Sequence, residues 1–181
     1  MFSRKFVRPG LVSTLAVASC LIGGMPLLSY AQSNPGFTIF SGIPRENQLG
    51  YHLDFGGQPN AFDRYKLRIP ATKMEIGVAQ IAISYPDYYD GKFDTGGIEV
   101  RVNGKSLPLS EVNWDKENQL VQIYLDEAIE AGNGVEIVFS NVKNPRFGGT
   151  YYFNCQILSP GDIPLPRYLG TWILSIGRSG N

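Results

Sequence analysis

Residues 138–155 read VFSNVKNPRFGGTYYFNC, and the predicted fold of this chain depends on them. Apolar and polar side chains alternate up to Val142, which predicts a β-strand. Asn144-Pro145 and then Gly148-Gly149 predict a turn, because these residue types favour the backbone angles that turns require. The aromatic run after the turn predicts a second strand. We interpret this corner as architectural and expect Tyr151 to hold the exit from the turn.

Further strand patterns lie at short intervals on both sides of the corner. Val121, Ile123 and Leu125, for example, alternate with Gln122 and Tyr124. Such period-2 segments, separated by Gly, Pro and Asn turns, are typical of an antiparallel sandwich or barrel. The predicted strands are Phe37–Phe40, Leu49–Phe55, Phe62–Ile69, Val78–Tyr85, Ile98–Val102, Leu120–Leu125, Val135–Val142, Thr150–Leu158 and Tyr168–Ile176.

Two local signals refine this prediction. Asn103-Gly104 follows the strand Ile98–Val102 and predicts a tight hairpin, since both residues accept positive φ. Leu125–Ala131, closed by Gly132, is the only helical pattern after the N-terminal segment and is long enough for a turn or two. We interpret it as the connection that crosses from one sheet to the other.

The N-terminal segment has the pattern of an export signal. Arg4, Lys5 and Arg8 precede a long uncharged apolar run, and Ser29-Tyr30-Ala31 offers a small-x-small cleavage site. We predict a cleaved signal peptide over residues 1–31 and a single domain over residues 32–181. The alternatives are a lipid anchor on Cys20 and an uncleaved membrane anchor, for which the apolar run is long enough.

Cleavage would change the charge and the thiol content of the chain. Removing Arg4, Lys5 and Arg8 from the 16 basic residues leaves 13 against 16 acidic residues, a net charge of −3. Nucleic acid and anionic membrane call for a basic face, so we expect neither as a partner. Cys155 would be the single remaining cysteine, which excludes an intramolecular disulfide. It shares strand parity with Tyr151 and Phe153, and we expect a buried, unreactive thiol.

The usual catalytic motifs are missing from the sequence. His52 is the only histidine, so neither a zinc or copper site of the usual ligands nor a Ser-His-Asp triad is supported. The sequence also has no nucleophile elbow, P-loop or dinucleotide-binding glycine run. We therefore interpret His52 as a structural or surface residue. Carboxylate pairs could still support glycosidase chemistry.

The segment from Tyr85 to Asp94 is where we look for function. Aromatic side chains on a loop supply a large contact area at low entropic cost, which suits recognition of a protein or a glycan. The predicted binding residues are Tyr85, Tyr88, Tyr89 and Phe93. Alternatively, some of these rings cap the core. Arg146 and Phe147, near the tip of the corner, offer a second candidate surface.

The same segment carries three carboxylates around an Asp-Gly turn. Hard oxygen donors grouped on one loop are what Ca²⁺ prefers, which makes Asp87, Asp90 and Asp94 a calcium-site hypothesis. Their spacing differs from that of the calcium loop with aspartates at alternate positions. The competing interpretation is a solvated acidic turn, since Asp and Gly are ordinary turn residues. No other cofactor is expected.

Several short motifs, taken together, resemble one known family. They are Tyr85-Pro86, Asp90-Gly91-Lys92-Phe93-Asp94, Val100-x-Val102, Asn141-Val142-Lys143-Asn144-Pro145, Gly149-Thr150-Tyr151-x-Phe153 and Pro166-x-Tyr168-Leu169-Gly170-Thr171-Trp172. The combination resembles a secreted cyanobacterial domain family of unknown function, domain of unknown function two-eight-zero-eight, over most of the mature chain. The resemblance implies an exported envelope protein with one domain, and it transfers no activity.

A looser resemblance is to immunoglobulin-like domains. Gly149-x-Tyr151 before an aromatic strand is similar to their tyrosine corner, although Cys155 follows Tyr151 by four residues instead of two and has no partner. We therefore predict an all-β fold, an antiparallel immunoglobulin-like β-sandwich.

The expected function follows from these features. We predict an exported, periplasmic or extracellular protein that is not an enzyme and serves the cell envelope as a recognition or structural module. Its partner would be an envelope protein or a glycan, with no stable membrane insertion after cleavage. The alternatives are an envelope polysaccharide-active enzyme that uses a carboxylate pair, and a calcium-binding surface module.

Overall fold

The computed structural model describes residues 42–161 and 166–177. These residues belong to one compact unit, Ile39–Asn181. The predicted signal peptide, the alternative lipid site at Cys20 and the predicted strand Phe37–Phe40 lie outside the described residues.

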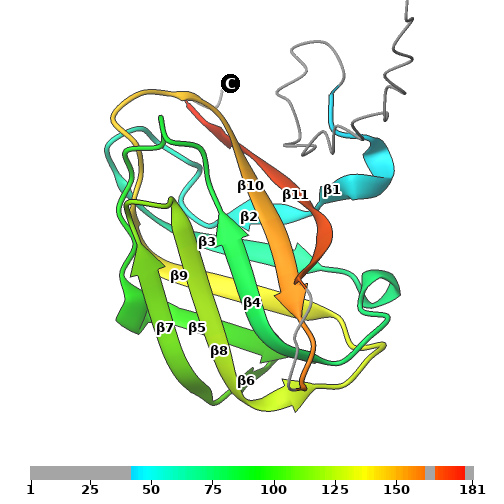
Figure 1. Ribbon diagram of the computed structural model, residues 1–181. Helices are drawn as coiled ribbons and strands as arrows, with labels where there is room; N and C mark the ends of the chain where they lie inside the picture. The colour runs from blue at the N-terminus through cyan, green and yellow to red at the C-terminus, as the bar shows by residue number, and fades with distance from the viewer. Residues whose placement is uncertain (1–41, 162–165, 178–181) are drawn as a thin grey trace, which may run out of the picture. The chain divides into compact units, whose positions relative to one another are not determined.

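The described chain forms two β-sheets (Figure 1). One has six strands in the order β1-β11-β10-β4-β8-β7, and the other has five in the order β2-β3-β9-β5-β6. The strands are β1 (Gln48–Leu49), β2 (Tyr51–Leu53), β3 (Phe62–Ile69), β4 (Val78–Ser84), β5 (Ile98–Val102), β6 (Lys105–Leu107), β7 (Leu109–Asp115), β8 (Leu120–Ile129), β9 (Val135–Lys143), β10 (Gly149–Leu158) and β11 (Pro166–Ile176). Three short 3₁₀ helices accompany them: η1 (Arg45–Asn47), η2 (Ala71–Lys73) and η3 (Thr95–Gly97). The predicted class, an antiparallel immunoglobulin-like β-sandwich, is confirmed.

Alternation along the strands places the core between the sheets. Every second residue of β10, from Tyr151 to Ile157, is buried. The opposite sheet contributes Tyr65 and Phe139, and the largest buried side chain is Trp172 on β11. Each buried side chain of this size stabilises the fold by roughly 1.5–3 kcal/mol through removal of apolar surface from water.

The corner between β9 and β10 has the predicted architecture. β9 belongs to the five-stranded sheet and β10 to the six-stranded sheet, so the chain changes layers there. The hydroxyl of Tyr151 donates a hydrogen bond to the carbonyl oxygen of Phe147, at 2.8 Å. This bond closes the turn onto backbone a few residues upstream, as in a tyrosine corner.

The hairpin prediction is also confirmed. Asn103 and Gly104 connect β5 to β6 with φ angles of 52° and 78°. Positive φ at both central residues is the geometry of the tight turn that joins two antiparallel strands.

Three sequence predictions need correction. The predicted strand Leu49–Phe55 divides at Gly50, because β1 pairs with β11 in one sheet and β2 pairs with β3 in the other. The possible helix at Leu125–Ala131 is wrong, since β8 continues to Ile129. The crossing between sheets follows it, before β9 begins at Val135. The strands β6 and β7 were absent from the prediction.

Cys155 lies in the core, as its strand parity predicted. Its thiol is free and fully buried, and burial raises its pKa well above the ordinary value. Within residues 42–161 and 166–177, no helix has the length and hydrophobicity needed to cross a membrane.

Candidate functional site

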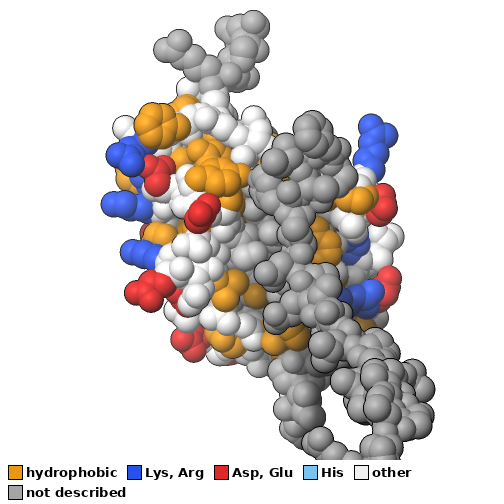
Figure 2. All heavy atoms as spheres, turned by 45° about the horizontal axis from the view of Figure 1, so that its top comes forward, with side chains coloured by type: hydrophobic (Ala, Val, Ile, Leu, Met, Phe, Trp, Pro, Cys, Tyr) orange, Lys and Arg blue, Asp and Glu red, His pale blue; other side chains and the backbone are white. Residues whose placement is uncertain are grey.

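Exposed aromatic side chains gather at one end of the sandwich. Phe55 (61% exposed), Phe62 (63%), Tyr88 (51%) and Phe147 (72%) lie on the β2–β3, β4–η3 and β9–β10 connections or at a strand end beside them. We call this end, formed by residues 54–62, 85–94, 116–119 and 144–149, the loop end. It is at the top of Figure 1. Figure 2 brings that end forward and shows hydrophobic side chains beside Lys, Arg, Asp and Glu.

Buried Asp63 holds the β2–β3 connection in place by hydrogen bonds to its backbone. Its carboxylate is buried and accepts hydrogen bonds from the backbone N–H groups of Phe55 (2.9 Å), Gly57 (2.7 Å) and Arg64 (2.7 Å). A buried carboxylate is stable when backbone donors satisfy it in this way. The position of Phe55 is therefore set by the fold.

Asn144 joins the β9–β10 connection to the β2–β3 connection. Its buried side-chain amide donates to the carbonyl of Gln58 at 2.8 Å and accepts from the hydroxyl of Tyr65. Its backbone N–H donates to the carbonyl of Ala61, and the N–H of Asn60 donates to the carbonyl of Pro145, both at 2.8 Å. The two connections that carry the exposed phenylalanines form one hydrogen-bonded unit.

The predicted binding aromatics divide into two groups. Tyr85, Tyr89 and Phe93 are buried, whereas Tyr88 is half exposed. Tyr89 stacks on Phe93 with ring centroids 5.5 Å apart, and both contact the core ring of Phe153. Burial raises the pKa of Tyr85 and of Tyr89, which keeps both phenols neutral. Of these four residues, Tyr88 is the one whose ring a partner could reach directly.

The three predicted calcium ligands do not converge. Asp90 pairs with Arg146, whose Nε lies 2.5 Å from Oδ2. Asp94 accepts from the backbone N–H of Gly96 at the start of η3 and from the side chain of Asn141. No group of three metal-ligating side chains occurs among the described residues. Asp90 and Asp94 bind different neighbours, and Asp87 lines the hollow described next.

A shallow hollow of about 210 Å³ lies beside this loop. It is lined by Tyr85, Asp87, Tyr89, Asp90, Gly91, Lys92, Trp114, Lys116 and Gln119. The indole N–H of Trp114 donates to the hydroxyl of Tyr85 at 2.7 Å, and the ammonium of Lys116 lies 4.2 Å from the Trp114 ring centroid. These contacts hold the indole in place, and the lining balances acidic with basic groups.

Arg146 lowers the pKa of its acidic neighbour, Asp90. The Arg146 side chain and then its backbone N–H, both hydrogen bonded to the carboxylate, hold the pKa of Asp90 below its usual range. A carboxyl group at its ordinary pKa is already ionised at neutral pH, and these hydrogen bonds further stabilise the ionised form of Asp90. The pair also connects the β4–η3 connection to the β9–β10 connection beside Phe147.

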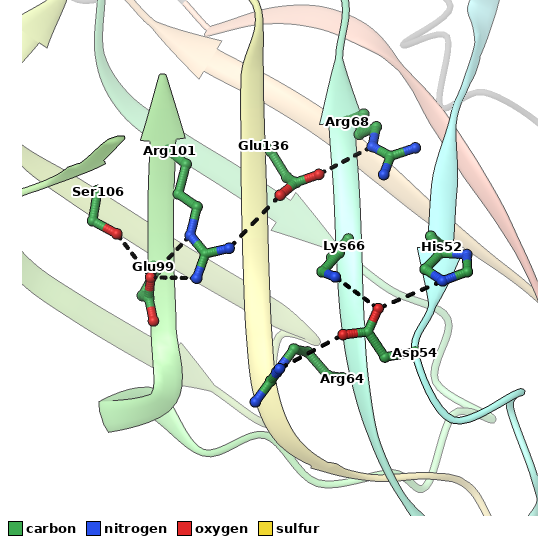
Figure 3. A network of polar contacts seen from close by, with 9 residues as sticks. All are labelled: His52, Asp54, Arg64, Lys66, Arg68, Glu99, Arg101, Ser106 and Glu136. Atoms are coloured by element: carbon green, nitrogen blue, oxygen red, sulfur yellow. Dashed lines mark hydrogen bonds and ion pairs between the residues drawn. The ribbon is translucent and has the colours of Figure 1, made fainter. Parts of the chain in front are cut away.

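The outer face of the five-stranded sheet is different and strongly charged (Figure 3). Glu136 contacts Arg68 at 3.0 Å and Arg101 at 3.9 Å, and Arg101 also contacts Glu99 at 2.8 Å. Each acidic group in this chain of contacts offsets a basic one. The result is a network on the sheet surface and not an unbalanced basic patch.

His52 lies at the edge of that charged face. Its Nε2 is 3.5 Å from Oδ1 of Asp54, and its side chain is 59% exposed. The Lys66 side chain, hydrogen bonded to Asp54, lowers the pKa of that carboxyl. The interpretation of His52 as a structural or surface residue agrees with this position.

The second candidate surface predicted from the sequence, Arg146 and Phe147, lies at the loop end. Phe55 and Phe62 are not among the residues predicted from the sequence. A signal for Phe62 exists, because it has the strand parity of Arg64 and Lys66 and so occupies the polar face of β3.

The fold and the corner define an antiparallel β-sandwich of immunoglobulin-like class. A family model described as "Protein of unknown function (DUF2808)" matches residues 37–176. The chain belongs to this family. The resemblance of the sequence motifs to this domain family of unknown function is thereby confirmed.

Solved structures with a similar arrangement include three bacterial examples. BslA, a bacterial hydrophobin, is 16% identical with a TM-score of 0.47, and the match covers 77% of this chain and 100% of BslA. The collagen-binding domain of a Staphylococcus aureus adhesin is 10% identical with a TM-score of 0.41, over 72% and 97% of the two chains. An immunoglobulin-like protein from Nocardia farcinica is 12% identical with a TM-score of 0.39, over 72% and 98%. No curated protein matches this sequence.

Proposed function

We propose that this protein is an exported, non-catalytic recognition module of the cell envelope, and that its loop end binds a protein partner. The observation that supports the proposal is the grouping of Phe55, Phe62, Tyr88 and Phe147, all more than half exposed, at one end of the sandwich. Large aromatic side chains that share one exposed surface are typical of protein interfaces.

The composition around these rings also suits a protein partner. Lys143 lies 5.0 Å from the Phe62 ring centroid, and Arg146 lies 5.9 Å from that of Phe147. Interfaces are enriched in aromatic residues and Arg, with polar groups around them. The apolar rings would supply affinity, and the charged groups would set orientation.

Anchoring of the connections supports binding without a large ordering cost. Asp63 and Asn144 are buried polar side chains whose hydrogen bonds hold the backbone beside the exposed phenylalanines. Association costs free energy for every segment that must become ordered. A surface that is already fixed retains more of its contact energy as affinity.

The resolved carboxyl pKa shifts give no support to the alternative polysaccharide enzyme. A glycosidase needs a carboxyl group with a raised pKa as proton donor. Among the described residues, the carboxyl groups with shifted pKa values are all shifted down: Asp54, Glu75, Asp90, Glu99 and Asp115. The pKa of Asp90, which lines the hollow, is lowered by the hydrogen bonds of Arg146.

Site-specific photo-crosslinking in cells tests the proposal. A photoreactive phenylalanine analogue at position 147 should crosslink to one protein of the envelope, and the same analogue at Ser106, on the charged face, should not. With a probe at Tyr88, substitution of Phe62 and Phe147 by Ser should reduce the same crosslink at least tenfold while the melting temperature stays within a few degrees.

Two results would overturn the proposal. One is the same crosslinking pattern from position 147 and from Ser106. The other is a Tyr88 crosslink that survives substitution of both phenylalanines. A fractionation experiment tests the export prediction separately, because a chain that remains in the cytoplasm would contradict it.

A further inference from the structure

The outer face of the six-stranded sheet has an unusual side-chain composition. Strand alternation buries Tyr151, Phe153, Cys155 and Ile157 of β10 and turns the intervening residues outward. The same parity on β4 and β8 adds further amides and an aromatic ring. We call the set Gln80, Gln122, Tyr124, Tyr152, Asn154 and Gln156 the amide–tyrosine face.

Cross-strand pairing brings these residues together. Gln156 on β10 is paired with Ala82 on β4, which in turn is paired with Gln122 on β8. Gln80 is paired with Tyr124 in the neighbouring row. Because adjacent strands lie about 4.8 Å apart, the face from β10 to β8 is about 10 Å wide. Figure 1 shows these three strands side by side.

This face differs in charge from the other sheet. The strands β4 and β10 contain no charged residue, and neither does β8 from Leu120 to Leu125. The outer face of the five-stranded sheet, by contrast, holds a network of Arg, Lys, Asp and Glu (Figure 3). Lys, Glu, Arg and Asp are the usual surface residues of proteins. An uncharged surface across three strands favours an uncharged ligand.

We propose that the amide–tyrosine face binds a neutral polysaccharide. Primary amides carry both donors and acceptors, which matches hydroxyl groups that are donors and acceptors themselves. Tyrosine adds a flat apolar ring with a polar tip, suited to a ligand with apolar and hydroxylated surfaces. Neutral amides also lose less hydration energy than charged groups when a ligand covers them.

A relay on the neighbouring strand orients one of the amides. The Thr171 hydroxyl donates to Oδ1 of Asn154 at 2.6 Å, and the Tyr168 hydroxyl lies 2.6 Å from the same Thr171 oxygen. With its oxygen engaged, Asn154 presents its NH₂ group as a donor. Tyr168 is 43% exposed and pairs with Gln156, so the relay extends the face toward β11.

Affinity electrophoresis of the full chain in native gels tests the proposal. The gels contain hydroxyethylcellulose, galactomannan or laminarin as neutral polysaccharides, and alginate as the anionic control. At least one neutral polymer should retard the protein, and alginate should not. Retardation by none of the three neutral polymers, or equal retardation by alginate, would overturn the proposal.

Variants assign any retardation to the face. Two variants, the single substitution Y152A and the double substitution Q122A/Q156A, should each weaken the apparent affinity for the polysaccharide at least tenfold. The glutamine pair tests the face even where loss of a tyrosine ring perturbs folding, which thermal melting would reveal. R68A on the charged face and F147S at the loop end should leave retardation unchanged. Unchanged retardation of the glutamine double variant, or its loss in F147S, would exclude the amide–tyrosine face as the binding site.

Discussion

The hydroxyl of Tyr65 on β3 donates a hydrogen bond to Oδ1 of Asn144, a residue 79 positions later at the start of the β9–β10 connection. Both residues are buried, and the same hydroxyl lies 3.2 Å from that of Tyr89. The core is thus tied by polar contacts to the connections that carry the exposed aromatic residues. Loss of the hydrogen bond between Tyr65 and Asn144 should therefore change both the stability of the protein and the geometry of the loop end.

N144A should lower the free energy of unfolding by about 2–4 kcal/mol, because it leaves the Tyr65 hydroxyl and the Gln58 carbonyl without this partner. Urea unfolding measures the change. N133A, at an exposed turn, is the matched control and should shift stability by less than about 0.5 kcal/mol. Equal effects of the two substitutions would show that the buried amide contributes little.

Y151F should destabilise the protein by about 1 kcal/mol, since it removes the hydrogen bond to the Phe147 carbonyl and keeps the ring. Crosslinking from position 147 should persist. Y152F, on the outward face of the same strand, is the control, and it should be nearly neutral. Unchanged stability of Y151F would refute the role of Tyr151 in closing the corner.

G170A should cost at least about 2 kcal/mol of stability. Gly170 has φ of +153°, and a Cβ there would lie 2.6 Å from the carbonyl oxygen of Asn47 and 2.9 Å from Leu49. The strand β1 would have to move away from β11. G177A, where a Cβ meets nothing within 4 Å, is the control for thermal unfolding. A melting temperature of G170A equal to that of G177A would contradict the close approach.

R146A should raise the pKa of Asp90 toward its ordinary value of about 3.9 while the backbone hydrogen bond retains part of the shift. The pKa of Asp90 is lower in the folded protein than in the unfolded chain. The Asp90–Arg146 pair therefore stabilises the folded protein at pH values above the unfolded-state pKa of Asp90. That contribution is lost as the pH falls through the folded pKa. Since the Arg146 side chain is 74% exposed and the Asp90 side chain 35%, solvent screens the pair, and its effect at neutral pH should be below about 1 kcal/mol.

Carboxyl ¹³C NMR titration of Asp90 in the wild type and in R146A checks the direction of the shift. A titration midpoint for Asp90 that does not rise in R146A would show that Arg146 is not its main charge partner.

Cys155 should resist thiol reagents in the folded protein, because it is fully buried and burial raises the pKa of its thiol. In the variant C20S, which leaves Cys155 as the only cysteine of the chain, 5,5′-dithiobis(2-nitrobenzoate) should react only after urea is added. Rapid reaction of the folded protein would place Cys155 outside the core.

The sequence predicts much of the fold because clear alternation marks its strands. Phe62–Ile69 and Ile98–Val102 agree with β3 and β5 at both ends. The strand β7 is not predicted from the sequence, because it lies at a sheet edge and its register with β8 shifts between Leu109 and Glu111. Alternation is weak where one face is half exposed and a bulge interrupts it.

The candidate site was harder to predict because burial on a connection depends on distant contacts. Tyr85, Tyr89 and Phe93 look like loop aromatics in the sequence, but Phe153 and other core rings from later strands cover them. The division of Leu49–Phe55 between two sheets is likewise a tertiary effect, set at Gly50 by separate partners for β1 and β2.

The parallel pairing of β1 with β11 has a mechanical consequence. Tension between residue 48 and residue 176 would pull these two strands lengthwise past each other, because they run in the same direction side by side. The hydrogen bonds between the two strands would then be loaded at the same time, in shear, and would not break one after another. When the domain is stretched between its two ends, the β1–β11 pair would be the first part of it to resist extension.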